Sequence, residues 1–218
     1  MYGRLSSQPA SFIPRSGNGG LRILYSDWML KFCVSVSWRT LLLMRENGWL
    51  MRFSERQRTA VDHALEHWAK FMLGKLPHPG PYEQHVIMVG SIDSSTLGGL
   101  PANINRYLLR TVDLDVVRTS NTAFVLTKMG KFFLLGFIDV LHPRQWRGTK
   151  INANRGHIGQ TDNIVPSQFW DYLKDEARRY AATHNRISER QRRKIDETMW
   201  GDLDRVAQSP PWRLCGTT

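Results

Sequence analysis

Acidic residues are scarce in this chain. Its 218 residues include 19 Asp and Glu against 30 Lys and Arg, which gives a formal net charge of +11 at pH 7. A positive surplus of this size attracts polyanions, because the summed field of the protein favours negatively charged partners. Nucleic acid, either DNA or RNA, is therefore the first partner to consider, ahead of acidic proteins and anionic membrane surfaces.

Cysteines and long apolar runs are lacking too. Two cysteines, Cys33 and Cys215, are too few for a disulfide framework or a cysteine zinc cluster, and they favour a reducing, cytoplasmic setting. The most apolar stretch, residues 21–44, is interrupted by Asp27, Lys31 and Arg39, so it predicts a core helix and not a membrane span. We expect no membrane partner. Residues 1–20 lack the unbroken apolar centre of a signal peptide.

Complete catalytic motifs are missing as well. The sequence contains no G-x-S-x-G nucleophile motif and no glycine-rich phosphate-binding loop, and Gly98-Gly99 alone indicates a turn. We therefore expect no cofactor. The sequence favours a non-enzymatic protein over an enzyme.

Length and composition fit one folded domain. A chain of 218 residues, 41% of them hydrophobic, can bury roughly 70% of its unfolded surface without help from disulfides or metals. We expect a flexible N-terminal arm at residues 1–20, a single α+β domain at 21–207, and a flexible tail at 208–218.

Hydrophobic periodicity and capping residues predict four helices and an antiparallel sheet. Helices are expected at 26–47, 54–73, 167–184 and 188–203, two of them beginning with Ser-x-x-Gln capping boxes. Strands are expected at 85–92, 112–116, 122–127, 131–140 and 148–152. Two of these form a hairpin around Met129-Gly130, and the strand at 148–152 pairs with one around His157. The predicted fold is α+β, with an N-terminal helix pair, a central antiparallel β meander and a C-terminal helix pair.

One local pattern has the form of a zinc-binding helix. His63, Glu66 and His67 match the H-x-x-E-H pattern of inverted zincins, in which two imidazoles four residues apart share a zinc and the Glu acts as base. The apolar residues of the same helix place both histidines on the opposite, outward face. We therefore interpret the pattern as a solvated helix face. A zinc hydrolase is the last-ranked alternative.

Two further groups of polar residues have an ordinary interpretation. His78 and His85 flank a Pro-rich connector and are interpreted as surface histidines. Asp113 and Asp115 share one face of a strand and could bind a divalent ion, but the Glu-x-Lys companion of metal-dependent nucleases is absent. Alternation of apolar residues inward and polar residues outward accounts for the aspartates.

The positive charge is concentrated in two segments. Residues 140–161 contain no acidic residue and four basic ones, and residues 174–194 contain eight basic residues against three acidic ones. We predict that both segments bind nucleic acid. The expected phosphate contacts are Arg144, Arg147, Lys150, Arg155, Arg190 and Arg193, with Trp146 stacking on a base. Six such contacts predict a log–log salt dependence of affinity with a slope near −5 for duplex DNA.

Four strings together resemble a known group of proteins. They are residues 31–39 (KFCVSVSWR), 77–80 with 83–85 (PHPG and EQH), 104–110 (INRYLLR) and 134–138 (LLGFI). These strings resemble uncharacterised bacterial proteins whose longer members begin with a CxxC…CxxC module similar to the zinc centre of HNH endonucleases. The resemblance covers about residues 22–207. Both CxxC pairs and their metal-binding His are missing here, so no HNH catalytic residue carries over, and the resemblance implies the companion domain of a nuclease-like architecture.

A different class of function remains open. The basic surface could dock on an acidic or nucleic-acid-mimicking protein as an interaction module of a defence or counter-defence system. Such a complex would persist after nuclease treatment, whereas a complex held together by nucleic acid would not.

Overall fold

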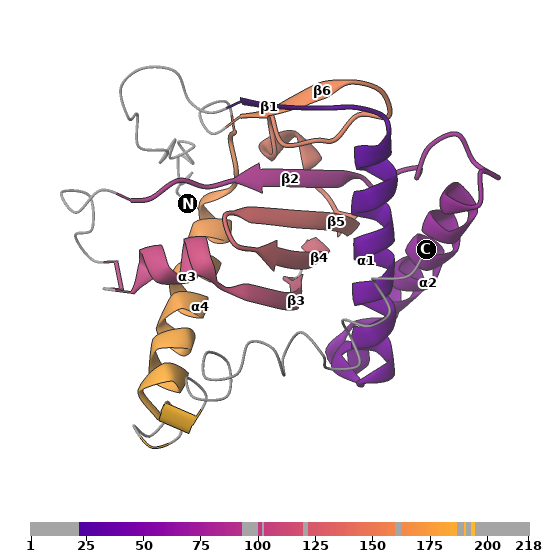
Figure 1. Cartoon of the computed structure of the whole chain (residues 1–218). Helices are drawn as coiled ribbons and strands as arrows, with labels where there is room; N and C mark the ends of the chain where they lie inside the picture. The colour runs from indigo at the N-terminus through magenta and orange to yellow at the C-terminus, as the bar shows by residue number, and fades with distance from the viewer. Residues whose placement is uncertain are drawn as a thin grey trace, which may run out of the picture.

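A computed structural model of the chain describes residues 22–92, 100–101, 103–119, 122–159 and 163–186, together with Arg190, Arg193 and Lys194. The expected α+β class is confirmed (Figure 1). The helices are α1 (Trp28–Glu46), α2 (Glu55–Met72), α3 (Ile104–Arg110) and α4 (Ser167–Arg186), with short 3-10 turns η1 (Trp49–Arg52) and η3 (Pro143–Gln145). The strands are β1 (Arg22–Tyr25), β2 (Gln84–Met88), β3 (Val112–Arg118), β4 (Thr122–Met129), β5 (Phe132–Val140) and β6 (Gly156–Gly159).

The main sheet has four strands in the order β2-β5-β4-β3, and every neighbouring pair is antiparallel. β3, β4 and β5 form the expected meander. The predicted hairpin is confirmed, since Met129 pairs with Phe132 and Gly130 turns the chain with φ +55°, a conformation that favours glycine. A separate ribbon consists of β1 paired with β6.

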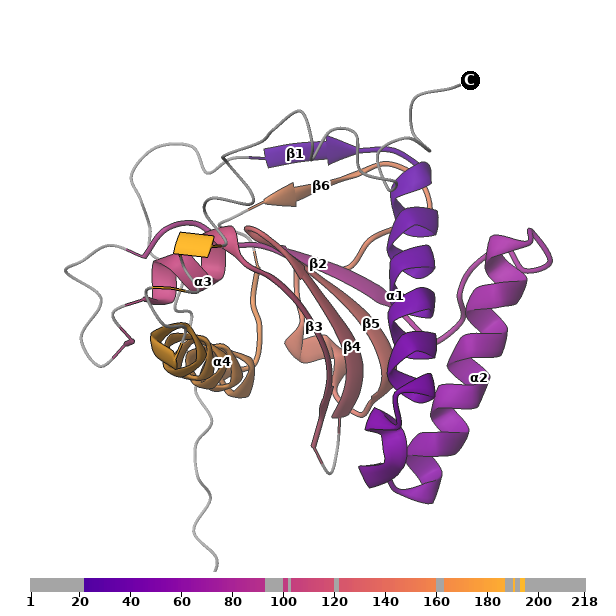
Figure 2. The same cartoon turned by 60° about the horizontal axis from the view of Figure 1, so that its bottom comes forward.

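Helices cover both faces of the main sheet (Figure 2). α1 and α2 lie on one face, and α3 and α4 lie on the other. Alternate residues of a strand point to opposite faces, so the central strands contribute to two cores. In β5, Leu134 and Ile138 belong to the core under α1 and α2, whereas Phe133, Leu135 and Phe137 belong to the core under α4. This explains why β5 reads as a nearly continuous hydrophobic run.

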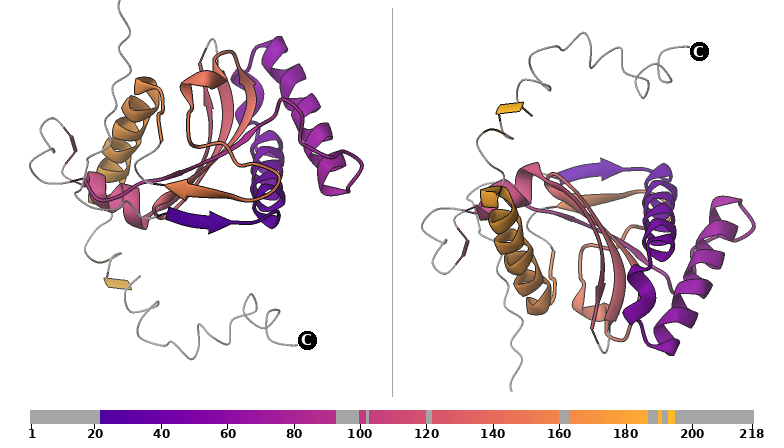
Figure 3. Two further views of the ribbon diagram at one scale, coloured as in Figure 1. Left: turned by 90° about the horizontal axis from the view of Figure 1, so that it is seen from above. Right: turned by 90° about the horizontal axis from the view of Figure 1, so that it is seen from below.

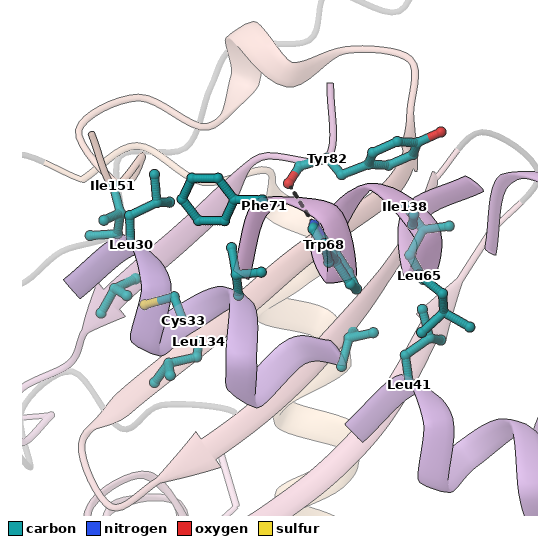
Figure 4. Close-up of a cluster of buried hydrophobic side chains, with 14 of the residues drawn as sticks. Leu30, Cys33, Leu41, Leu65, Trp68, Phe71, Tyr82, Leu134, Ile138 and Ile151 are labelled. Carbon is teal, nitrogen blue, oxygen red and sulfur yellow. Dashed lines mark hydrogen bonds between the residues drawn. The ribbon is translucent and has the colours of Figure 1, made fainter. Parts of the chain in front are cut away.

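The core under α1 and α2 is tightly packed around Trp68, a fully buried side chain (Figure 4). Its Nε1 donates a hydrogen bond to the Tyr82 carbonyl at 3.1 Å. The sheet approaches α1 closely at Gly136, where an added Cβ would lie 2.6 Å from Ser37 Oγ and 3.0 Å from Trp68 Cη2. Any larger residue at this position would therefore collide with α1.

The predicted start of α2 is confirmed. Ser54 Oγ accepts a hydrogen bond from the Gln57 backbone N–H, and the Gln57 side-chain oxygen accepts one from the Ser54 backbone N–H, both at 3.3 Å. These reciprocal bonds satisfy two of the N–H groups that a helix start leaves without partners. The helix ends at Met72, one residue before the predicted end.

The sequence predicts Ser26 as the cap of α1, and the observed cap lies one residue later. This cap is Asp27, whose Oδ1 accepts a hydrogen bond from the Trp28 backbone N–H at 3.0 Å. Residues 22–25, expected to belong to the apolar helical stretch, form β1 instead, because they pair with a strand far along the chain. Among the described residues, no helix is long and apolar enough to cross a membrane.

One other expectation about the fold is wrong, and one helix has no counterpart in the expectations. Residues 148–152 do not pair with the strand around His157; Lys150 forms a bridge to His85 in β2, and His157 pairs with Leu24 in β1. α3 is a helix of seven residues that periodicity does not predict. The helix expected at 188–203 lies outside the described residues except for three exposed positions, and the arm at 1–20 and the tail at 208–218 lie outside them entirely.

The close approach at Gly136 gives a test of the packing. Gly136→Ala is expected to lower the free energy of unfolding by about 1–3 kcal/mol, because its methyl group must displace either α1 or Trp68. Urea unfolding followed by circular dichroism measures this change. An unchanged midpoint would show that α1 does not lie against β5 as described.

Candidate nucleic-acid interface

The first basic segment runs along one edge of the main sheet. We call residues 141–155 the edge segment. It leaves β5, forms η3, passes along β2 and enters β6. The Val86 N–H donates to the Thr149 carbonyl and the Ile151 N–H donates to the Gln84 carbonyl, both at 2.8 Å. Residues 149–151 therefore extend the sheet beyond β2 as a short additional strand.

A second pair of backbone bonds fixes the segment further upstream. Arg147 and Ile164 exchange two N–H···O bonds of 3.0 Å each. These bonds connect the edge segment to the residues that lead into α4. The backbone that carries the basic side chains is consequently held at two places.

Trp146 anchors the edge segment in the core under α4. Its side chain is 6% exposed, and its ring lies 5.6 Å from that of Phe124, 5.4 Å from Phe137 and 5.3 Å from Phe169, between centroids. The expectation that Trp146 stacks on a nucleic-acid base is therefore wrong, since no face of the indole is available. Packing of the buried Trp146 ring against three other aromatic rings stabilises the segment instead.

Ile151 performs the same task on the opposite face of the sheet. It is 3% exposed and belongs to the core under α1 and α2 (Figure 4). The edge segment thus inserts one large side chain into each core, one on each side of the sheet edge.

His85 is buried, which corrects its interpretation as a surface histidine. The side chain is 1% exposed and its ring stacks on Phe137 at 4.0 Å between centroids. Its Nδ1 lies 2.8 Å from Thr149 Oγ1 and its Nε2 lies 3.3 Å from Glu83 Oε2. Burial lowers the pKa of His85, although the hydrogen bond to Glu83 acts in the other direction. A neutral ring that donates from Nε2 and accepts the Thr149 hydroxyl at Nδ1 satisfies both neighbours.

The order Glu83–His85–Thr149 matches that of a carboxylate–imidazole–hydroxyl triad. Thr149, however, is 1% exposed, so its hydroxyl cannot reach a substrate. The three residues instead connect β2 to the edge segment through side chains.

Glu83 adds an ion pair to this connection. It accepts hydrogen bonds from His85 and from Lys150 Nζ, and these bonds, with that of His85 contributing most, lower the pKa of Glu83 to about 2. Lys150 is thus already paired with a carboxylate, and its contact with phosphate stays a prediction. Its charge holds the edge segment to the residue before β2.

Three arginines of the edge segment remain exposed. Arg144, Arg147 and Arg155 have no ion-pair partner among the residues that the structure describes. Some of the cations on the helices differ in this respect. Four of them are paired with carboxylates one turn away: Lys70 with Glu66, Lys174 with Asp171, Arg178 with Asp175, and Arg179 with Glu176, at 2.5–2.6 Å.

The second basic segment does not join the first. α4 begins three residues after Ile164, which bonds to Arg147, and a helix of 20 residues is roughly 30 Å long. Arg190 and Arg193 are exposed, but they follow the far end of this helix, which points away from the β2 edge (Figure 1). Screening at physiological salt extends only about 8 Å. The two groups of cations therefore do not add their fields on a common surface.

Two residues of the H-x-x-E-H pattern, Glu66 and His67, have side-chain partners within the protein. His67 Nδ1 lies 2.9 Å from the His63 carbonyl, and its ring packs against Tyr82 at 5.2 Å between centroids. Glu66 is exposed and bonded to Lys70, which lowers the pKa of Glu66. In the described part of the chain, no group of three His, Cys, Asp or Glu side chains is placed to hold a metal ion.

Asp113 and Asp115 face the helices, so the prediction that they point outward is wrong. The Tyr107 hydroxyl donates to Asp113 at 3.1 Å and the Tyr172 hydroxyl donates to Asp115 at 2.8 Å. Opposite Asp113 in the sheet is Lys128, fully buried, whose pKa burial lowers to about 8. The two tyrosine–aspartate hydrogen bonds connect α3 and α4 to β3. The aspartates do not face water because α3 and α4 cover this face of the sheet.

Comparison of the chain with known proteins gives no match to a family model, a curated protein or a solved structure. Function must therefore be inferred from the geometry of the described residues.

The anchoring role of Glu83 predicts a pH-dependent effect on stability. Glu83→Gln is expected to lower the free energy of unfolding by about 1–3 kcal/mol at pH 7. The variant lacks the negative carboxylate that accepts hydrogen bonds from His85 and Lys150. The pKa of Glu83 is lower in the folded protein than in the unfolded chain, where it is near 4.3. The carboxylate therefore contributes its full stabilisation above that unfolded pKa, and this stabilisation is lost as the pH falls toward 2. Urea unfolding at pH 7, 5 and 3 measures the difference from wild type, which should shrink at pH 3.

The matched control is Glu66→Gln, which removes a carboxylate from an exposed pair. It should change the free energy of unfolding much less than Glu83→Gln does, because solvent screens an exposed pair. Equal effects of the two substitutions would contradict the anchoring role of Glu83.

Proposed function

We propose that this chain binds nucleic acid through the phosphate backbone, with Arg144, Arg147 and Arg155 as the contacts. The observation that carries the proposal is that these three guanidinium groups are exposed, without carboxylate partners in the described residues, on a backbone held against the sheet edge. A planar guanidinium matches two phosphate oxygens at once, and a fixed backbone lowers the entropy lost on binding.

Recognition of this kind is independent of base sequence. Contacts to phosphate position a protein on a nucleic acid but do not distinguish bases. Trp146, the one aromatic residue of the edge segment, is buried and cannot add a base contact there. The proposed activity of the edge segment is therefore general binding of the phosphate backbone.

The proposal is that of a non-enzymatic domain in a cytoplasmic setting. Its place beside a nuclease module follows only from the resemblance to the HNH-associated bacterial proteins. On that interpretation the exposed arginines hold the polynucleotide, and a separate catalytic part cuts it.

The salt dependence of binding tests the proposal. Three phosphate contacts predict a log–log slope of about −3 for duplex DNA in fluorescence anisotropy measurements. The triple variant Arg144→Gln, Arg147→Gln, Arg155→Gln is expected to lose at least tenfold in affinity at low salt and most of this slope, because its phosphate contacts are removed.

The control is a second triple variant, Lys70→Gln, Lys174→Gln, Arg178→Gln. It lowers the net charge by the same amount but removes only cations that are paired with carboxylates. It should retain the wild-type slope. The proposal fails if wild type shows no binding at low salt, or if both triple variants lose affinity equally; a complex from native lysate that survives nuclease would then favour an acidic protein partner.

A further inference from the structure

Two aromatic side chains are exposed at the start of α1. Trp28 is 57% exposed and Phe32, one turn later, is 39% exposed, with their rings 6.0 Å apart in an edge-to-face arrangement. Leu24, at the end of the preceding strand, is 84% exposed. Exposed apolar side chains that lie together are typical of a ligand-binding or partner-binding surface.

The β1–β6 ribbon brings this pair next to the edge segment. Tyr25 pairs with Gly156 and Leu24 pairs with His157, so Arg155 lies beside the residue that follows β1, close to the start of α1. Figure 3 shows the ribbon leading directly into α1. Residues directly opposite or two apart share a face of a ribbon. Arg155, His157 and Leu24 therefore lie on the same face.

The junction between the ribbon and α1 is tightly built. Tyr25 is 7% exposed, and its hydroxyl accepts a hydrogen bond from the Asn152 N–H at 3.1 Å. Gly156 lies so close that a Cβ there would overlap the Tyr25 hydroxyl. Arg155 is consequently held in position relative to the start of α1, although more than a hundred residues separate it from Trp28.

The start of α1 carries one exposed cation and adjoins a second one. Lys31 is exposed in the first turn of α1, and Arg155 is exposed at the end of the edge segment. The carboxylate nearest in sequence, Asp27, accepts the Trp28 backbone N–H as the helix cap. An indole beside cations suits a nucleobase with its phosphate, because every base has a face that stacks and every nucleotide has a negative charge.

We propose that Trp28, with Phe32 at its edge, stacks on an unpaired nucleobase while Arg155 binds the adjacent phosphate. This inference rests on the proposed function and deepens it, since it makes single-stranded nucleic acid the preferred ligand. The stacking residue is Trp28, brought to the basic segment by the fold, and not Trp146, which belongs to that segment in sequence but is buried.

Binding to two single strands tests the assignment. One is a short oligothymidylate, and the other is an abasic strand with the same number of phosphates. Trp28→Ala is expected to weaken binding of the oligothymidylate about tenfold, because the variant loses the ring that stacks on a base, and to leave binding of the abasic strand unchanged. Trp28→Phe, which keeps an aromatic face, should restore most of the affinity.

The control is Trp49→Ala. Trp49 is 54% exposed, almost as much as Trp28, but it lies in η1 beyond the opposite end of α1, which is roughly 28 Å long. Its removal should not change binding of either strand.

The outcomes separate this inference from the proposed function. If Trp28→Ala binds the oligothymidylate as tightly as wild type while the arginine triple variant still loses affinity, the stacking assignment is overturned and phosphate binding stands. If Trp49→Ala weakens binding as much as Trp28→Ala, the assignment is also overturned. If wild type binds duplex DNA but neither single strand, this inference falls and phosphate binding stands; if it binds none of the three ligands, both proposals fall.

Discussion

The pairing of the edge segment with β2 is the interaction on which the candidate interface depends. An edge strand presents N–H and C=O groups that need partners, and Thr149 and Ile151 supply them. His85 and Glu83 reinforce the backbone bonds through Thr149 and Lys150. Because one cation of the segment acts as an anchor, its arginines can be exposed on a backbone that does not have to be ordered when a ligand binds.

The edge segment also combines buried packing residues with exposed cations. Trp146 and Ile151 enter the cores on the two sides of the sheet, whereas Arg144 and Arg147 face water. The buried hydrophobic side chains hold the backbone in place and so determine the positions of the charged side chains. At its end the segment enters the ribbon with β1, which places Arg155 beside the start of α1.

Local signals predicted much of the fold, and long-range pairings explain what they missed. The capping box of α2, the turn at Gly130 and the periodicity of α4 involve neighbours in sequence, so they can be recognised without a structure. The β1–β6 ribbon joins residues that are far apart, and no local pattern identifies such a partner. For the same reason Trp146 and His85 were interpreted as surface residues: a polar or basic neighbourhood in sequence does not reveal that both faces of the sheet are covered.

Amide hydrogen exchange of the full chain tests the central claim, that the edge segment is part of the sheet, most directly. The amides of Arg147 and Ile151 donate to Ile164 and Gln84, so they should exchange as slowly as amides of the central strand β5, which open only with larger units of structure. Exchange of both amides at the rate of an unstructured peptide, while β5 stays protected, would contradict the account, because the arginines would then lie on a free loop.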